Sequence, residues 1–72
     1  MKNLYRGAFN YGRFVKVEYA YASSEKQARV VFCNRLAKKD GVHPSVLMDL
    51  FAAGRDNYEI KIETEFTEEQ NG

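Results

Sequence analysis

The chain has few of the residues on which small secreted domains, metal centres and many enzymes depend. It holds one cysteine, Cys33, one proline, one histidine and no tryptophan among 72 residues. A single cysteine excludes an intramolecular disulfide and a cysteine-based zinc site, whereas small secreted domains usually carry several disulfides. No apolar run approaches the roughly 20 residues of a membrane span, and no secretory apolar run follows the charged start. We therefore expect a cytoplasmic protein that has no membrane contact, no cofactor, no metal and no small-molecule substrate.

Neither sign of charge dominates the composition, but the charges are unevenly distributed along the chain. Eleven basic and ten acidic residues leave a net charge of +1, which excludes a uniformly basic protein. Residues 1–41 carry nine basic and three acidic side chains, a balance of +6, and residues 42–72 carry two and seven, a balance of −5. A hydrophobic content of 44% argues against disorder. We expect one domain over residues 1–66 and a flexible acidic tail over residues 67–72.

Two segments rich in Tyr, Phe and Val, residues 4–11 and 14–22, have the composition of β-strands. Gly12 lies between them and can adopt the positive φ of a tight turn, so the pair predicts a β-hairpin. The last strand is predicted over residues 58–66, where apolar and charged residues alternate with period two.

Two helices are predicted between the hairpin and the last strand. Ser24 and Gln27 fit the capping box that begins a helix, and Gly41 is placed to end it in a left-handed conformation. The second helix is expected to begin at Pro44, a favoured first residue, and to end at Gly54. Its expected apolar face consists of Val46, Leu47, Leu50 and Phe51.

The order of elements is ββααβ, which predicts an α+β fold. A right-handed crossover after the hairpin brings the last strand beside the first, antiparallel to it. We expect a three-stranded antiparallel sheet in the order 2-1-3, with both helices packed on one face and the other face open.

The residues that could carry catalysis are isolated from one another. His43, the single histidine, precedes a helix and has no neighbouring nucleophile, and Cys33 falls in the middle of a helix rather than at its start. The acidic residues near the end of the chain have the pattern of a solvated surface: Glu63, Glu65, Glu68 and Glu69. We therefore expect no catalytic residues and no enzymatic activity.

The aromatic residues of the hairpin allow two interpretations. If they face the helices, Gly7 lets a helix approach closely and a mixed-charge face suited to a protein partner remains open. Its expected residues are Arg6, Asn10, Arg13, Lys16, Glu18, Glu59 and Lys61. If the aromatics face solvent, they can stack on bases while basic residues of the hairpin and first helix meet phosphates. That nucleic-acid surface consists of Tyr5, Arg6, Phe9, Tyr11, Arg13, Lys16, Arg29, Arg35, Lys38 and Lys39.

Two partial resemblances to known families accompany these patterns. Within residues 36–51, the spacing of Ala37, Gly41, Val42 and Leu47 resembles the helix-turn-helix signature of repressors, which implies DNA contact through the second helix. Residues 5–9, 22–25 and 60–63, with Ala28, are similar in order to the small ribosomal LX proteins. That similarity implies a comparable architecture and contact with ribosomal RNA.

From the residues themselves, a protein partner is the preferred prediction. We expect a small non-catalytic interaction domain that binds a protein partner through its open sheet face or an edge strand, an adaptor or inhibitor of the kind that phages and mobile elements encode. The alternative protein partner is a second copy of the chain, joined through an unpaired edge strand. Nucleic acid, RNA or DNA, is the alternative ligand, with affinity that falls steeply with salt.

Overall fold

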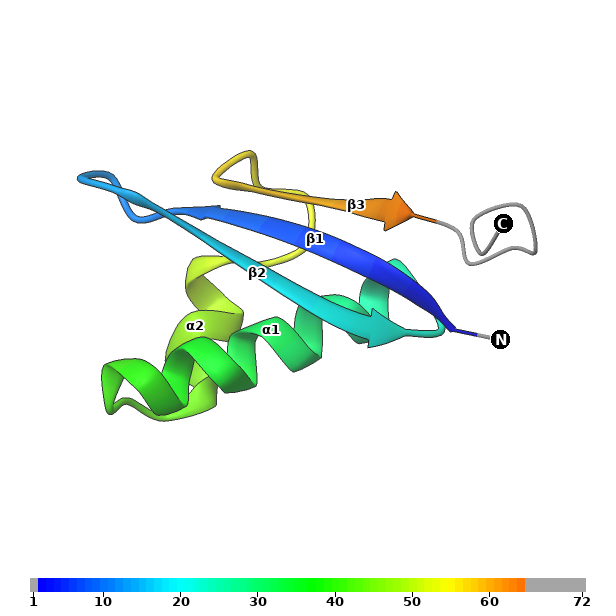
Figure 1. Ribbon diagram of the computed structural model, residues 1–72. Coiled ribbons are helices and arrows are strands. Elements are labelled where there is room, and N and C mark those ends of the chain that lie inside the picture. Colours follow the sequence, from blue (N-terminus) through cyan, green and yellow to red (C-terminus); the bar gives the residue numbers. More distant parts are fainter. Residues whose placement is uncertain (1, 65–72) are drawn as a thin grey trace.

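The computed structural model describes residues 2–64 and has the predicted α+β fold. Its elements are β1 (Asn3–Asn10), β2 (Val15–Ala22), α1 (Glu25–Asp40), α2 (Pro44–Leu50) and β3 (Tyr58–Thr64). Both β2 and β3 pair antiparallel with β1, so the strand order is β2-β1-β3. The two helices lie on the same side of the sheet, and the other side is open (Figure 1). The predicted end of the last strand and the predicted acidic tail lie outside the described residues.

The hairpin closes through a two-residue turn. The Tyr11 N–H donates to the Phe14 carbonyl at 2.9 Å, and Gly12 adopts a φ of 99°. The Asn10 side-chain oxygen accepts a hydrogen bond from the Gly12 N–H at 2.7 Å, as asparagines before turns commonly do. The prediction of a turn at Gly12 is confirmed.

Side-chain and backbone caps define both ends of α1. The Ser24 hydroxyl accepts from the Gln27 N–H at 3.1 Å, and the Gln27 side chain accepts from the Ser23 N–H at 2.6 Å. At the other end Gly41 has a φ of 72°, as predicted. The N–H of the next residue, Val42, donates to the Ala37 carbonyl. Within described residues 2–64, no helix is long and apolar enough to span a membrane.

Helix α2 is shorter than predicted. It begins at Pro44, but it ends at Leu50, and Gly54 lies in the turn beyond it with a φ of 91°. Its seven residues make about two turns. One side of α2 packs against α1, and its other side is exposed to solvent. Leu47 and Phe51, the residue after the end of the helix, are buried, whereas Val46 and Leu50 are exposed. Half of the predicted apolar face was therefore wrong.

The core lies between the sheet and the helices and is built around three phenylalanines. Phe9 makes edge-on contacts with Phe32 and Phe51, with ring centroids 5.5 and 5.0 Å apart. Gly7 allows this packing, because a Cβ added there would lie 2.7 Å from the Phe9 ring and 2.8 Å from the Phe32 ring. Tyr5 and Phe9 therefore face the helices, in agreement with the first of the two interpretations.

Candidate interaction surfaces

A column of apolar side chains runs along β2 on the open face of the sheet. Val15, Val17, Tyr19 and Tyr21 are 56%, 41%, 46% and 57% exposed. They lie at alternate positions, so they share one face, and Ala20 and Ala22 face the helices. Alternation along the sequence predicts that the four residues share a face, but it does not decide on which side of the sheet that face lies.

Lys16 and Glu18 were expected on the open face, and the structure places them on the helix side instead. Their cross-strand partners are Phe9 and Gly7, whose side chains or Cβ positions face α1. The Lys16 ammonium lies 2.8 Å from the Asp40 carboxylate, and the Lys39 ammonium lies 2.7 Å from the Glu18 carboxylate. The last turn of α1 thus supplies an opposite charge for each residue, which is why this part of β2 can point its charged side chains inward.

Four other predicted residues do belong to the open side: Arg6 and Asn10 of β1 and Glu59 and Lys61 of β3. Arg6 lies opposite Tyr19 on one side and opposite Lys61 on the other. Two like charges directly opposite each other on neighbouring strands disfavour folding slightly and favour an anionic partner. Lys61 also lies 3.4 Å from the Glu59 carboxylate, in an ion pair exposed to solvent. Arg13 is exposed at the hairpin turn, away from this pair.

The aromatic residues predicted to stack on bases are largely withdrawn from solvent. Tyr5 is 6% exposed and Phe9 is fully buried. Tyr11 stacks on Phe14 with ring centroids 5.1 Å apart, and its hydroxyl donates to Asp40 at 3.1 Å. Desolvation and the neighbouring Asp40 carboxylate raise the pKa of Tyr11 to about 12. The ammonium of Lys16 lies over both rings, 5.2 Å from the centroid of Tyr11.

Several predicted cations of α1 contact other elements of the fold. Arg29 donates to the Phe51 carbonyl at 3.1 Å, Arg35 donates to the Tyr19 carbonyl, and Lys39 pairs with Glu18. Lys38 is exposed. The basic residues therefore do not combine with Tyr5 and Phe9 into one surface.

His43 and Cys33, the residues considered for catalysis, both make contacts within the fold. His43 is the N-cap of α2, where its Nδ1 accepts from the Ser45 N–H at 3.1 Å. Cys33 is buried, its thiol lies 3.7 Å from the Leu47 carbonyl oxygen, and burial raises its pKa. Within residues 2–64, no three His, Cys, Asp or Glu side chains are grouped as metal ligands.

The two helices that resemble a helix-turn-helix are joined by residues 41–43. The exposed residues of α2 include Ser45, Val46, Asp49 and Leu50. None of these carries a positive charge, and Asp49 would approach the phosphates of DNA unfavourably.

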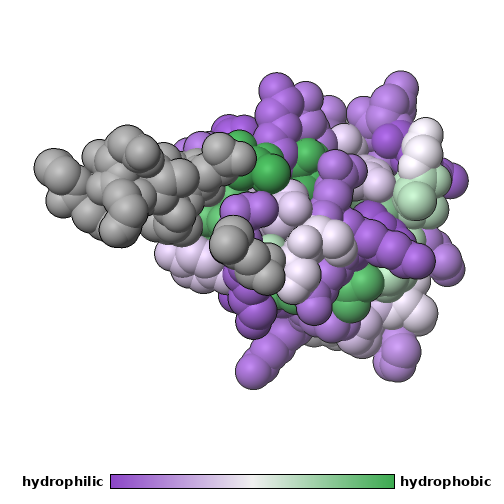
Figure 2. Space-filling model, turned by 90° about the vertical axis from the view of Figure 1, so that its right-hand side faces the viewer, coloured by the Kyte–Doolittle hydropathy of each residue, from purple (hydrophilic) through white to green (hydrophobic). Residues whose placement is uncertain are grey.

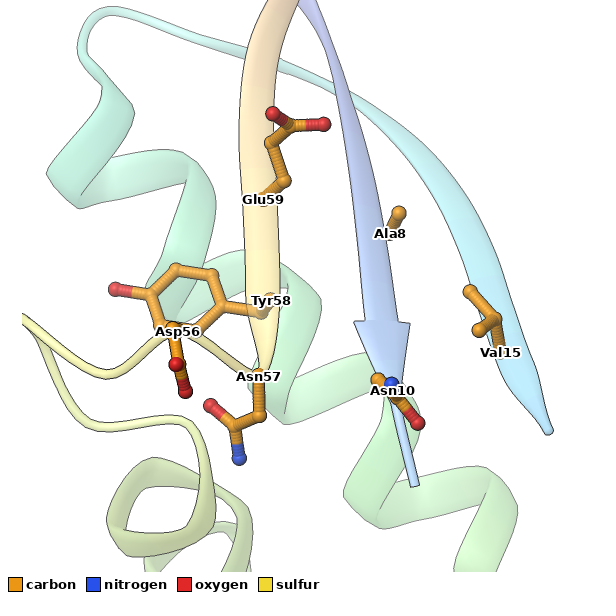
Figure 3. A pocket seen from close by; sticks show the side chains of 7 residues that line it. All are labelled: Ala8, Asn10, Val15, Asp56, Asn57, Tyr58 and Glu59. Carbon is orange, nitrogen blue, oxygen red and sulfur yellow. The ribbon is translucent and has the colours of Figure 1, made fainter. Parts of the chain in front are cut away.

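A shallow hollow of about 420 Å³ lies at one end of the sheet (Figure 3). It is lined by residues of all three strands and of the loop before β3: Ala8, Asn10, Val15, Asp56, Asn57, Tyr58 and Glu59. Asn57 fixes this loop, because its side-chain amide donates to the Leu50 carbonyl at 2.8 Å. The acidic residues Asp56 and Glu59 line the same hollow as Val15, so the apolar column of β2 is bordered by acidic side chains at this end.

A deeper groove of about 490 Å³ lies on the helix side, between β3 and the first turns of α1. Its lining consists of Glu25, Lys26, Arg29, Ala53, Tyr58 and Ile60. The groove is not predicted by the sequence, because it depends on where α1 lies on the sheet. The alternation of β3 did place Tyr58 and Ile60 on one face.

Viewed from the end at which β1 begins, the molecular surface is mainly hydrophilic, with separate hydrophobic patches between hydrophilic side chains (Figure 2). Comparisons of the chain with protein families, with characterised proteins and with solved structures give no match.

Proposed function

We propose that the protein is a small non-catalytic interaction domain, an adaptor or inhibitor, that binds a protein partner through the open face of its sheet. The observation that carries this proposal is the exposed column of Val15, Val17, Tyr19 and Tyr21 on β2. Contiguous exposed apolar side chains with a polar surround are typical of protein interfaces.

The polar part of the same face indicates the chemistry of the partner. Arg6 and Lys61 lie side by side next to Tyr19, so a carboxylate on the partner can approach both cations while apolar groups cover the column. A standard interface covers about 800 Å² per partner, against a total accessible surface of 5036 Å². Because the face combines an apolar column with the cations Arg6 and Lys61, the expected partner is a protein with an apolar contact surface and at least one acidic residue beside it.

The proposal is tested by affinity capture from nuclease-treated extract of the source cell. Wild-type protein is compared with Val17→Lys, which places a charge within the column, and with Asn34→Lys, which places the same charge on the exposed side of α1. A protein retained by wild type and Asn34→Lys but lost with Val17→Lys supports the proposal. Equal retention by the wild type and both variants contradicts it.

Nucleic acid is the second candidate, and the row formed by Tyr19, Arg6 and Lys61 is the observation that favours it. An exposed aromatic ring beside two cations can stack on a base while the cations meet phosphates. Val15 and Val17 have no comparable role on a nucleic acid, so we place this function second. Titration with single- and double-stranded DNA and RNA at low salt tests it, and absence of binding there removes it.

A further inference from the structure

Helix α1 lies against β2 at its last turn and leaves a groove between its first turns and β3. Its last turn contacts β2 through the Lys39–Glu18 and Lys16–Asp40 pairs, and its first turns line the groove beside β3. Ile62, on the same side of β3 as Ile60, remains 46% exposed. An apolar strip thus continues along β3 beyond the groove.

The backbone of β3 faces outward beside this groove. The Asn10 N–H donates to the Asn57 carbonyl, which sets the phase of pairing between β1 and β3. In an antiparallel sheet, successive residues of an edge strand direct their backbone N–H and C=O groups alternately toward and away from the neighbouring strand. Glu59 and Lys61 therefore direct these groups toward β1. Tyr58, Ile60 and Ile62 direct theirs away from the sheet, where no strand of described residues 2–64 pairs with them.

The lining of the groove selects what can lie against this edge. Ala53, Tyr58 and Ile60 form an apolar floor, which suits an apolar side chain. Lys26 and Arg29 on the α1 wall exceed the single acid, Glu25, by one charge. One guanidinium nitrogen of Arg29 donates to the Phe51 carbonyl and contacts the Met48 sulfur, so the N–H donors on its other nitrogens can meet a ligand.

We propose that the outer edge of β3 binds an extended peptide from a partner protein as a fourth strand. Alternate apolar side chains of the peptide enter the groove between β3 and α1, and an acidic group of the peptide meets Lys26 and Arg29. Main-chain hydrogen bonds to Tyr58, Ile60 and Ile62 supply affinity, and the groove supplies sequence selectivity. This site is separate from the apolar column of β2, so it stands or falls independently of the function proposed above.

The test uses a displayed library of random linear peptides and then a synthetic copy of an enriched peptide. Peptides with apolar residues at alternate positions and an acidic residue are expected to be enriched. Ile62→Pro removes an outward N–H without removing a hydrogen bond to β1, and it should weaken binding by about tenfold. Ile62→Val keeps that N–H and should bind as wild type does. Lys26→Glu should weaken binding by a similar factor through charge.

Amide exchange identifies where the peptide lies. Protection of the Ile60 and Ile62 amides by the peptide supports addition to β3, and binding that survives Val17→Lys separates this site from the open face. Three results would overturn the proposal: no enriched peptide, equal binding by Ile62→Pro and Ile62→Val in folded protein, or protection of β2 amides in place of β3 amides.

Discussion

The two edge strands of the sheet have opposite arrangements of apolar and charged side chains. On β2, the apolar residues Val17 and Tyr19 face the open side, and the charged residues Lys16 and Glu18 face the helices. On β3, the charged residues Glu59 and Lys61 face the open side, and apolar residues face the helices. The same period-two alternation therefore produces an exposed apolar column at one edge and a sheltered groove at the other.

The position of α1 explains the difference. Its end lies against β2, where Asp40 and Lys39 neutralise the inward charges and Arg35 donates to the outward-facing carbonyl of Tyr19. Contacts of this kind protect an edge strand from pairing with another chain. Edge strand β3 has no equivalent contact within residues 2–64. We therefore expect a partner to pair with the backbone of β3, and a partner at β2 to contact the side chains of the open face.

The largest expected difference between the edges is in stability. Ile60→Ala removes a side chain that is 7% exposed, and it should lower the free energy of unfolding by about 2 to 4 kcal/mol. Val17→Ala removes a side chain that is 41% exposed, and it should cost under about 1 kcal/mol. Urea unfolding followed by circular dichroism measures both. Equal losses would show that Val17 belongs to the core and would remove the open face as a binding surface.

The elements of this fold could be predicted from the sequence because each of their signals is local, and the right-handed crossover rule then gave the strand order. Ser24 with Gln27, Gly41 and Gly12 mark the ends of elements through their own backbone and hydrogen bonds. The facing of β2 could not be predicted in the same way, because either phase of its alternation is compatible with a strand. The choice depends on Asp40 and Lys39, which are more than 20 residues away in the sequence.

The candidate sites were harder to predict than the fold for the same reason. The open side was predicted correctly for two residues of β1 and two of β3, because the inward-facing Phe9 and Ile60 decide which face of each strand points away from the helices. These four residues are Arg6, Asn10, Glu59 and Lys61. The groove beside β3 requires the crossing position of α1, which no local pattern contains.

A medium effect is expected from the N-cap of α1, whose first turns form one wall of the β3 groove. Ser24→Ala removes the acceptor of the Gln27 N–H and should cost about 1 kcal/mol. Ser23→Ala is the matched control, because Ser23 contributes its backbone N–H to the cap and keeps it after substitution. Amide exchange should rise in the first turn of α1 and leave the contacts of its last turn with β2 unchanged. Uniform loosening of both ends would contradict the separate roles of the two ends.

The smallest expected effect concerns the charged contact that holds α1 against β2. The hydrogen bond from Lys16 is the main cause that lowers the pKa of the Asp40 carboxyl below its usual value, and the Tyr11 hydroxyl adds to it. A lowered pKa in the folded state gives a stabilisation that is present above the unfolded-state pKa of about 4 and is lost as pH falls through the folded value. Asp40→Asn should therefore unfold at lower urea than wild type at pH 7, and the difference should shrink as pH falls below about 4.

Asp49→Asn provides the control for this titration, because Asp49 lies on the exposed side of α2 and makes no ion pair within residues 2–64. In Asp40→Asn, nuclear magnetic resonance shifts should change at Tyr11, Phe14 and Lys16. Resonances of Ile60 and Ile62 should stay in place, because the first turns of α1 hold the groove without Asp40. Changes of equal size at both edges would mean that α1 moves as a rigid rod, and the two edges would then be coupled rather than independent.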